Sequence, residues 1–136
     1  MRKLIILLVL PLCACSNQFS GSTCNLVDYS DKTEKIWGDF NELETLAYES
    51  TIDDKINLSS IMDHLQQTRD VYAQLELPSC YETTHSSYLE YMDLTIEVWS
   101  YVADGGEAGD SEYMNLLNAS AEALNQALGE SNKLGK

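Results

Sequence analysis

The sequence predicts an all-α protein: a cleaved leader and a short tether, followed by an up-down-up-down four-helix bundle. Apolar residues recur at steps of three and four along residues 31–129, which is the spacing of one helix face, and strand-like alternation is almost absent. The expected helices are also similar in length, about 30 to 36 Å at 1.5 Å per residue. Short links between helices of matched length favour antiparallel neighbours, so the up-down-up-down order is the simplest arrangement.

The leader comprises residues 1–14. Arg2 and Lys3 precede an apolar run from Leu4 to Leu12. Nine residues in a helix rise only about 14 Å, which is half of a bilayer core, so this run is too short for a stable transmembrane span. A positive start, a short apolar segment and a small residue before a cleavage point are typical of a secretory signal peptide.

The residues Leu12-Cys13-Ala14-Cys15 resemble the lipobox of bacterial lipoprotein precursors. In that motif an aliphatic residue stands three positions before the modified cysteine and a small residue directly before it. The resemblance implies cleavage between Ala14 and Cys15, a thioether-linked diacylglycerol on Cys15 and an acylated amino terminus, with chains such as palmitate. Cys13 is a poorer candidate, because Leu12 would then occupy the small-residue position. The resemblance covers residues 1–15 alone.

The resemblance also implies a location in a bacterial cell envelope, facing the periplasm or the cell surface. Several buried acyl chains hold a protein in a membrane far more firmly than one chain does. Ser16, rather than an aspartate, follows the lipidated cysteine, which favours the outer membrane if the cell is Gram-negative. The lipid is therefore the expected membrane contact, and an envelope protein is an expected partner.

Removal of the leader leaves 122 residues, enough for one domain with a modest core. Six basic residues then face 22 acidic ones, a formal charge of −16. Such an excess of negative charge argues against binding nucleic acid and against lying flat on an anionic lipid surface. We expect it to serve mainly to keep an extracytoplasmic domain in solution.

Cys24 and Cys80 are the two cysteines left once Cys13 is removed and Cys15 is lipidated. In an oxidising compartment such a pair indicates a disulfide, and no C-x-x-C spacing suggests a metal or redox site. In an up-down-up-down bundle the first and third helices begin at the same end. Because Cys24 precedes the first helix and Cys80 opens the third, the pairing is geometrically reasonable.

Residues 15–30 form the expected lipidated tether, and the first helix is expected from Asp31 to about Ser50. The Asp31 carboxylate can cap the early backbone amides while Glu34 reaches back, which is a capping box. The expected buried face of this helix comprises Ile36, Phe40, Leu43, Ala47 and Ser50.

The second helix is expected from Leu58 to near Leu77, after residues 51–57 interrupt the periodicity. Pro78 disfavours helix at the residue before it, and Ser79 with Glu82 forms the strongest capping box in the chain. The third helix is expected to start there. Its expected buried seam comprises Tyr81, His85, Tyr88, Met92, Thr95, Trp99 and Val102.

The third helix is expected to end at residues 104–106, where a glycine can adopt the left-handed conformation of a C-cap. Asp110 is the expected cap of the fourth helix, which Gly129 closes, and residues 130–136 are expected to fray. The expected buried face of the fourth helix comprises Tyr113, Leu116, Leu117, Ser120, Ala121, Leu124 and Leu128.

Histidine is the first residue type to consider for a metal centre. Glu82-Thr-Thr-His85 matches the Glu-x-x-His unit of di-iron bundles, but those sites need a second such unit and the sequence has none. His64 is expected about 10 Å from His85 along the bundle axis. The acidic residues of 104–112 lack the EF-hand spacing. We therefore expect no metal and no cofactor, with His85 hydrogen-bonded to a nearby tyrosine, glutamate or carbonyl.

A ligand pocket is the one chemical feature that the third helix suggests. Its seam is more polar than a bundle core requires, because buried tyrosine hydroxyls need partners. Tyr81, His85, Tyr88 and Trp99 are the expected lining residues. The sequence has no G-x-S-x-G turn, no free thiol beside a histidine and no glycine-rich phosphate cradle, so we do not expect an enzyme.

Two function classes remain from the sequence. The first is a non-catalytic, membrane-anchored extracytoplasmic helical module that binds a protein partner or supports the cell envelope. The second is a periplasmic binder of a small molecule or metal, with its pocket along the tyrosine and histidine seam of the third helix.

Overall fold

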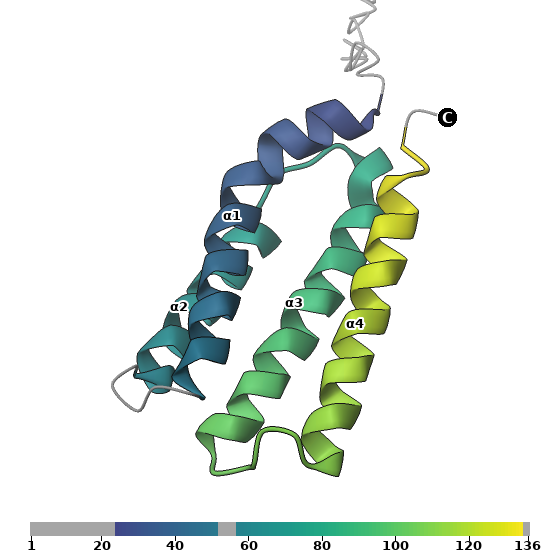
Figure 1. Ribbon diagram of the computed structural model, residues 1–136. Helices are drawn as coiled ribbons and strands as arrows, with labels where there is room; N and C mark the ends of the chain where they lie inside the picture. The colour runs from purple at the N-terminus through teal and green to yellow at the C-terminus, as the bar shows by residue number, and fades with distance from the viewer. Residues whose placement is uncertain (1–23, 52–56, 135–136) are drawn as a thin grey trace, which may run out of the picture.

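The computed structural model describes residues 24–51 and 57–134, and these form an all-α four-helix bundle (Figure 1). Its elements are α1 (Leu26–Ser50), α2 (Leu58–Ala73), a 3-10 turn η1 (Ser79–Tyr81), α3 (Glu82–Ala103) and α4 (Ser111–Ser131). Successive helices run in opposite directions, as the sequence predicts. No helix of the described ranges is long and apolar enough to cross a membrane. The lipobox and Cys15 lie outside the described residues.

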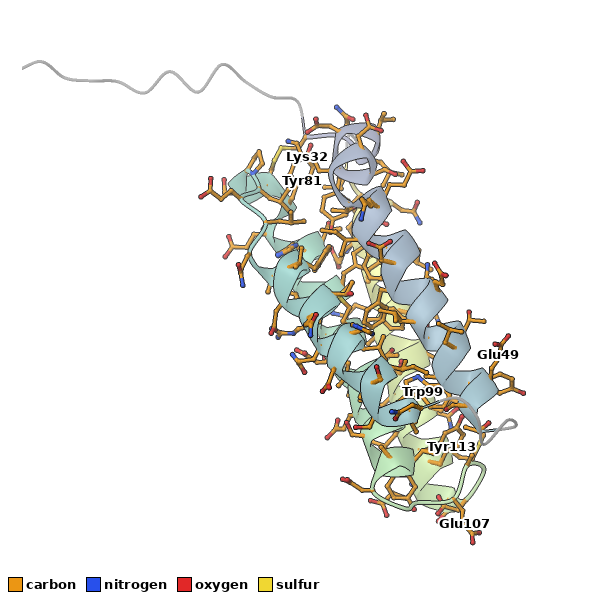
Figure 2. The ribbon with its side chains drawn as sticks, turned by 90° about the vertical axis from the view of Figure 1, so that its left-hand side faces the viewer. Lys32, Glu49, Tyr81, Trp99, Glu107 and Tyr113 are labelled. Carbon is orange, nitrogen blue, oxygen red and sulfur yellow. A yellow bond between two sulfur atoms is a disulfide. The ribbon has the colours of Figure 1, made fainter. Side chains whose placement is uncertain are left out.

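The two ends of the bundle differ, and we name each by what it carries. The disulfide end carries Cys24 and Cys80, at the starts of α1 and η1, together with the end of α4. The loop end carries the α3–α4 connection, residues 104–110. Figure 2 shows Lys32 and Tyr81 near the first end and Trp99, Tyr113 and Glu107 toward the second.

The start of α1 differs from the sequence prediction. Asn25 has extended backbone angles, and its side-chain oxygen accepts a hydrogen bond from the Asp28 N–H at 2.8 Å. Asp31, the expected cap, is an exposed residue inside the helix. Residues 26–30, expected in the tether, are therefore helical. The earlier start buries Tyr29, so tertiary packing adds to the strong capping preference of asparagine.

The connection between α2 and α3 also departs from expectation. α2 ends at Ala73, four residues before Leu77. The expected capping box of Ser79 is not formed, because η1 tightens the chain there and the Tyr81 N–H donates to the Pro78 carbonyl at 2.9 Å. The non-helical segment lets the chain cross from α2 to α3 at the disulfide end.

The α3–α4 connection has the glycine C-cap and the Asp110 N-cap that the sequence predicts. Gly105 has φ of +97°, the left-handed conformation, and its N–H donates to the Val102 carbonyl at 3.1 Å. The Gly106 N–H donates to the Tyr101 carbonyl at 2.9 Å, which completes a Schellman motif. Asp110 caps α4 as predicted, accepting from the Tyr113 N–H at 2.8 Å.

The face that α4 buries is partly different from the predicted one. Its buried residues are Tyr113, Ser120, Ala123, Ala127 and Ser131, whereas Leu128 is 45% exposed and Ala121 is exposed. Small side chains let two helices approach closely, and the Thr95 and Ser120 hydroxyls are hydrogen-bonded at 2.8 Å between α3 and α4. The helix continues through Gly129 to Ser131, so residues 130 and 131 are not frayed.

The third-helix seam is confirmed at Tyr81, Met92, Thr95 and Trp99, which are buried. His85, Tyr88 and Val102 are only half-buried. A second row of buried residues lies beside the seam, namely Thr84, Ser87, Tyr91 and Val98. α3 packs against both α2 and α4, and a helix with two neighbours buries more than one stripe.

The two candidate caps of α1 provide a test of where this helix begins. Asn25→Ala removes the observed capping acceptor and should lower the free energy of unfolding by about 1 kcal/mol. Asp31→Ala changes an exposed residue inside the helix and should leave stability within about 0.5 kcal/mol of the parent. Urea denaturation followed by circular dichroism measures both. A larger loss for Asp31→Ala than for Asn25→Ala would contradict this start.

Candidate functional site

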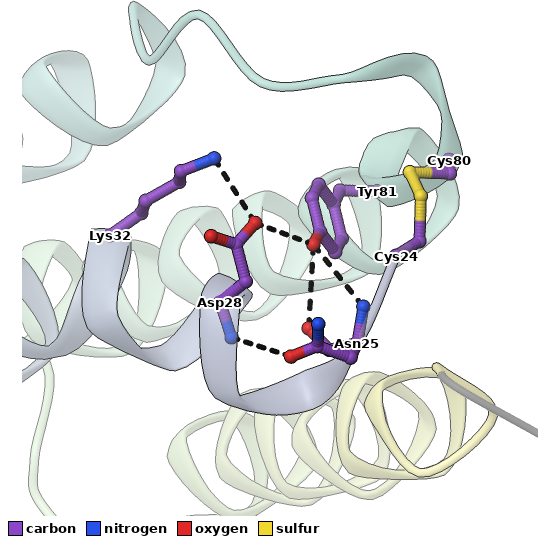
Figure 3. The surroundings of a disulfide bond; sticks show 6 residues. All are labelled: Cys24, Asn25, Asp28, Lys32, Cys80 and Tyr81. Carbon is purple, nitrogen blue, oxygen red and sulfur yellow. Dashed lines mark hydrogen bonds and ion pairs between the residues drawn. A yellow bond between two sulfur atoms is a disulfide. The ribbon is translucent and has the colours of Figure 1, made fainter. Parts of the chain in front are cut away.

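A disulfide between Cys24 and Cys80 closes the end of the bundle where α1 and α3 begin (Figure 3). The two Cα atoms are 6.1 Å apart and the residues are 56 positions apart in the chain. The predicted pairing is confirmed. The disulfide joins the residue preceding the α1 cap to the turn that leads into α3, so it holds these two helix starts at one level.

Tyr81 forms a hydrogen-bonded network beside the disulfide. Its hydroxyl donates to Asp28 Oδ2 at 2.8 Å and accepts from the Asn25 N–H at 3.3 Å. Lys32 Nζ lies 3.2 Å from the same carboxylate oxygen and 5.9 Å from the centre of the Tyr81 ring. Figure 3 shows these groups converging from α1 and η1. Tyr81, one of the four expected pocket residues, therefore ties two helix starts together.

The network changes the ionisation of both of its acidic groups. The Tyr81 hydroxyl, followed by the Lys32 ammonium, holds the pKa of Asp28 below its ordinary value. Burial, followed by the hydrogen bond to Asp28, raises the pKa of Tyr81. The pair is thus a carboxylate and a neutral phenol, which is the combination that this hydrogen bond requires.

Tyr88, another expected pocket residue, belongs to a packed aromatic cluster that we define as Tyr29, Trp37, Tyr72, Tyr81, His85, Tyr88 and Tyr91. The Tyr88 ring centre is 4.4 Å from that of Trp37 and 6.2 Å from that of Tyr29. The hydroxyls of Tyr29 and Tyr72 are hydrogen-bonded to each other, so two buried phenols satisfy one another. Side chains therefore fill this part of the seam.

His85 lies at the margin of the aromatic cluster, with its ring centre 4.4 Å from that of Tyr72. Its Nδ1 is buried and has no hydrogen-bond partner among the described residues, so the expected bond is not formed at this atom. The ring packs on Tyr72 instead, and burial lowers the pKa of His85. It lines a small cleft of about 250 Å³ beside Pro78 and Glu82.

His64 lies in a different place. It is exposed on α2 and lines a cleft of about 330 Å³ with Asp39 and Glu42 of α1. The structure therefore does not bring His64 and His85 to a common site. Within residues 24–51 and 57–134, no group of three His, Cys, Asp or Glu residues is placed to hold a metal ion.

Trp99, the fourth expected pocket residue, lines a larger cavity that we call the Trp99 cleft. Its volume is about 560 Å³, and α1, α3 and α4 contribute its walls. The lining residues are Asn41, Glu44, Thr45, Tyr48, Trp99, Tyr113 and Leu117. The Trp99 side chain is buried, and its Nε1 has no hydrogen-bond partner among the described residues. Sequence reasoning identified Trp99 but missed its neighbours.

Glu44 supplies the negative charge of the Trp99 cleft. The Tyr91 hydroxyl donates to Glu44 Oε2 at 2.8 Å, which positions the carboxylate. Burial raises the pKa of Tyr91, and the Glu44 carboxylate raises it further. Burial also raises the pKa of Tyr113 across the cleft, with Tyr48 and Glu44 adding to the effect.

The acidic loop at residues 104–112 is organised by its own caps. Asp110 accepts from the Tyr113 N–H and, through Oδ2, from the Tyr101 hydroxyl at 2.5 Å. The bond from Tyr101 lowers the pKa of Asp110, and it raises the pKa of Tyr101 to about 12. Both oxygens of this carboxylate therefore already have donors, as the sequence interpretation of a capped turn implies.

Comparisons of the chain with family models, with curated proteins and with solved structures found no match.

Reduction of the disulfide should destabilise the domain. Closure of a loop of 56 residues constrains the unfolded chain by roughly 4 kcal/mol in the entropy model. Urea denaturation with and without a phosphine reductant should show a loss approaching this size. A Cys24→Ser/Cys80→Ser variant should start from the lower stability and not respond to the reductant. Equal stability of reduced and oxidised protein would contradict a stabilising bridge.

The buried phenols should make the domain sensitive to alkali. Burial raises the pKa of Tyr29 to about 12, and it raises the pKa values of Tyr72 and Tyr91 as well. Each contributes stability that is complete below the unfolded tyrosine pKa of about 10 and is lost as the pH rises through the folded value. Tyrosinate absorbance and circular dichroism should therefore show late ionisation accompanied by loss of helix. Tyr29→Phe should weaken this alkaline dependence; ionisation of every tyrosine near pH 10 in a folded protein would contradict it.

Proposed function

We propose that this chain is a lipid-anchored extracytoplasmic lipoprotein whose helical bundle is a non-catalytic binding or accessory module of a bacterial cell envelope. The observation that carries the proposal is the Cys24–Cys80 disulfide. Structural disulfides persist in oxidising compartments, so the bridge favours export from the cytoplasm. The lipobox resemblance of residues 12–15 then supplies the means of attachment, through Cys15.

The position of the disulfide supports an orientation for the anchored domain. Nine residue steps separate Cys15 from Cys24, which is at most about 30 Å of extended chain. The disulfide end would therefore lie nearest the membrane. Leu26 and Val27 expose apolar surface at this end. Lys32 and Lys133 also lie there, each in an ion pair, with Asp28 and with Glu130. The loop end would face away from the lipid.

Partner binding suits the chemistry of the described residues better than catalysis does. The Glu82 and His85 unit belongs to no group of three His, Cys, Asp or Glu residues placed to hold a metal ion within residues 24–51 and 57–134. The carboxylate of Asp110 is occupied by capping and by Tyr101. We propose an envelope protein as the partner, because the strong negative charge disfavours nucleic acid.

The two leader cysteines test the anchor with a matched control. Cys15→Ala should move the protein from the membrane fraction to the supernatant and abolish metabolic labelling with palmitate. Cys13→Ala removes a neighbouring thiol from the same leader and should leave both properties unchanged. Globomycin, which blocks lipoprotein signal peptidase, should make the lipidated precursor accumulate. A Cys15→Ala protein that still sediments with membranes would overturn the proposed attachment.

Small-molecule binding is a second candidate function, and one observation favours it. Of the four residues expected to line a pocket, Tyr81 and Tyr88 are packed against other side chains. Trp99 instead lines the largest of the cavities described above. The lining of that cavity points to a specific ligand chemistry.

A further inference from the structure

Three aromatic side chains from three helices line the Trp99 cleft: Tyr48 of α1, Trp99 of α3 and Tyr113 of α4. The ring centres of Trp99 and Tyr113 are 6.3 Å apart, and their planes are inclined by 63°. The edge of one ring therefore packs against the face of the other. Tyr48 is 57% exposed, so its ring is open to an incoming ligand.

Aromatic faces carry partial negative charge and attract a cation within about 6 Å of the ring centre. Glu44 adds a full negative charge to the same lining. The hydrogen bond from Tyr91 positions this carboxylate without neutralising it, because a phenol donates a proton but brings no charge. The cleft therefore combines aromatic walls with a fixed anion, a combination that suits an organic cation.

The surrounding charges reinforce this preference. From Asp70 to Asn132, a stretch that includes all of α3 and α4, the sequence has twelve Asp or Glu and no Lys or Arg. Along α1 the cation nearest before Glu44 is Lys35, nine residues away, or about 14 Å of helix. A cleft in a field of one sign concentrates ligands of the opposite sign.

We propose that the Trp99 cleft binds a small organic ammonium ion, quaternary or tertiary. The aromatic rings and the Glu44 carboxylate recognise the cationic head. An inorganic metal ion suits the cleft less well, because Glu44 is the one carboxylate among the described residues of its lining. The cavity of about 560 Å³ is within the usual size of small-molecule sites. This inference does not depend on the lipid anchor.

Binding can be measured by calorimetry on the purified full chain in a non-ionic detergent. The probes are choline, tetramethylammonium and 3,3-dimethylbutan-1-ol, the neutral carbon isostere of choline. Choline should bind saturably, and the neutral isostere should bind at least about tenfold more weakly, because cation–π attraction depends on the charge. Tetramethylammonium carries the same quaternary head as choline and should also bind saturably.

Two variants and a matched control connect the binding to the cleft. Glu44→Gln keeps an oxygen acceptor for Tyr91 but removes the charge, and Tyr48→Ala removes an exposed ring; each should weaken choline binding about tenfold. Glu49→Gln removes an equal charge from the same helix, outside the cleft lining, and should change affinity less than about twofold. Circular dichroism checks that each variant is folded.

Several outcomes would overturn the proposal. Absence of saturable choline binding to the folded parent chain would do so, as would equal binding of the neutral isostere. Equal losses in Glu44→Gln and Glu49→Gln would assign the effect to overall charge and overturn the cleft as the site. Absence of tetramethylammonium binding would overturn recognition of the cationic head. By contrast, choline binding by a soluble Cys15→Ala protein would support the cleft as a binding site that does not depend on the lipid anchor.

Discussion

The covalent and hydrogen-bonded junction between the starts of α1 and α3 is the constraint on which the rest of the structure depends. The disulfide holds Cys24 and Cys80 with their Cα atoms 6.1 Å apart, and Tyr81 bonds to Asp28 and Asn25 directly beside it. Because both helices begin at this level and run the same way, their side chains meet in a defined register. The early start of α1 at Leu26 belongs to the same arrangement, since it brings Asp28 to the Tyr81 hydroxyl and buries Tyr29.

The core of the bundle has two chemically different halves. Toward the disulfide end the aromatic cluster packs rings against rings, and its buried hydroxyls find partners in one another or in carboxylates. Toward the loop end, Trp99 and Tyr113 line a cavity together with residues of α1. The proposed membrane-near end and the proposed ligand cleft therefore lie in different parts of the bundle.

Features that depend on neighbouring residues were predictable, and features that depend on distant packing were less so. Gly105 and Asp110 act as caps as expected, because a left-handed glycine and a capping carboxylate serve backbone groups only a few residues away. The capping boxes at Asp31 and at Ser79 were wrong, since packing of Tyr29 moved one helix start and the disulfide-linked turn changed the other. Leu128 was expected to be buried, but the close approach of α3 selects Ala123 and Ala127 as the contact residues of α4.

The four helices, their alternating directions and the Cys24–Cys80 pairing could be read from the amino-acid sequence. They follow from local periodicity, short links and the count of cysteines. Which part of the third-helix seam is packed and which part is open became evident only from the folded bundle. Tyr81, His85, Tyr88 and Trp99 share helical spacing, yet only Trp99 lies beside Glu44 and Tyr113, residues that are far from one another in the chain. The reason is physical: periodicity specifies which residues share a helix face, whereas a cavity depends on how closely neighbouring helices approach.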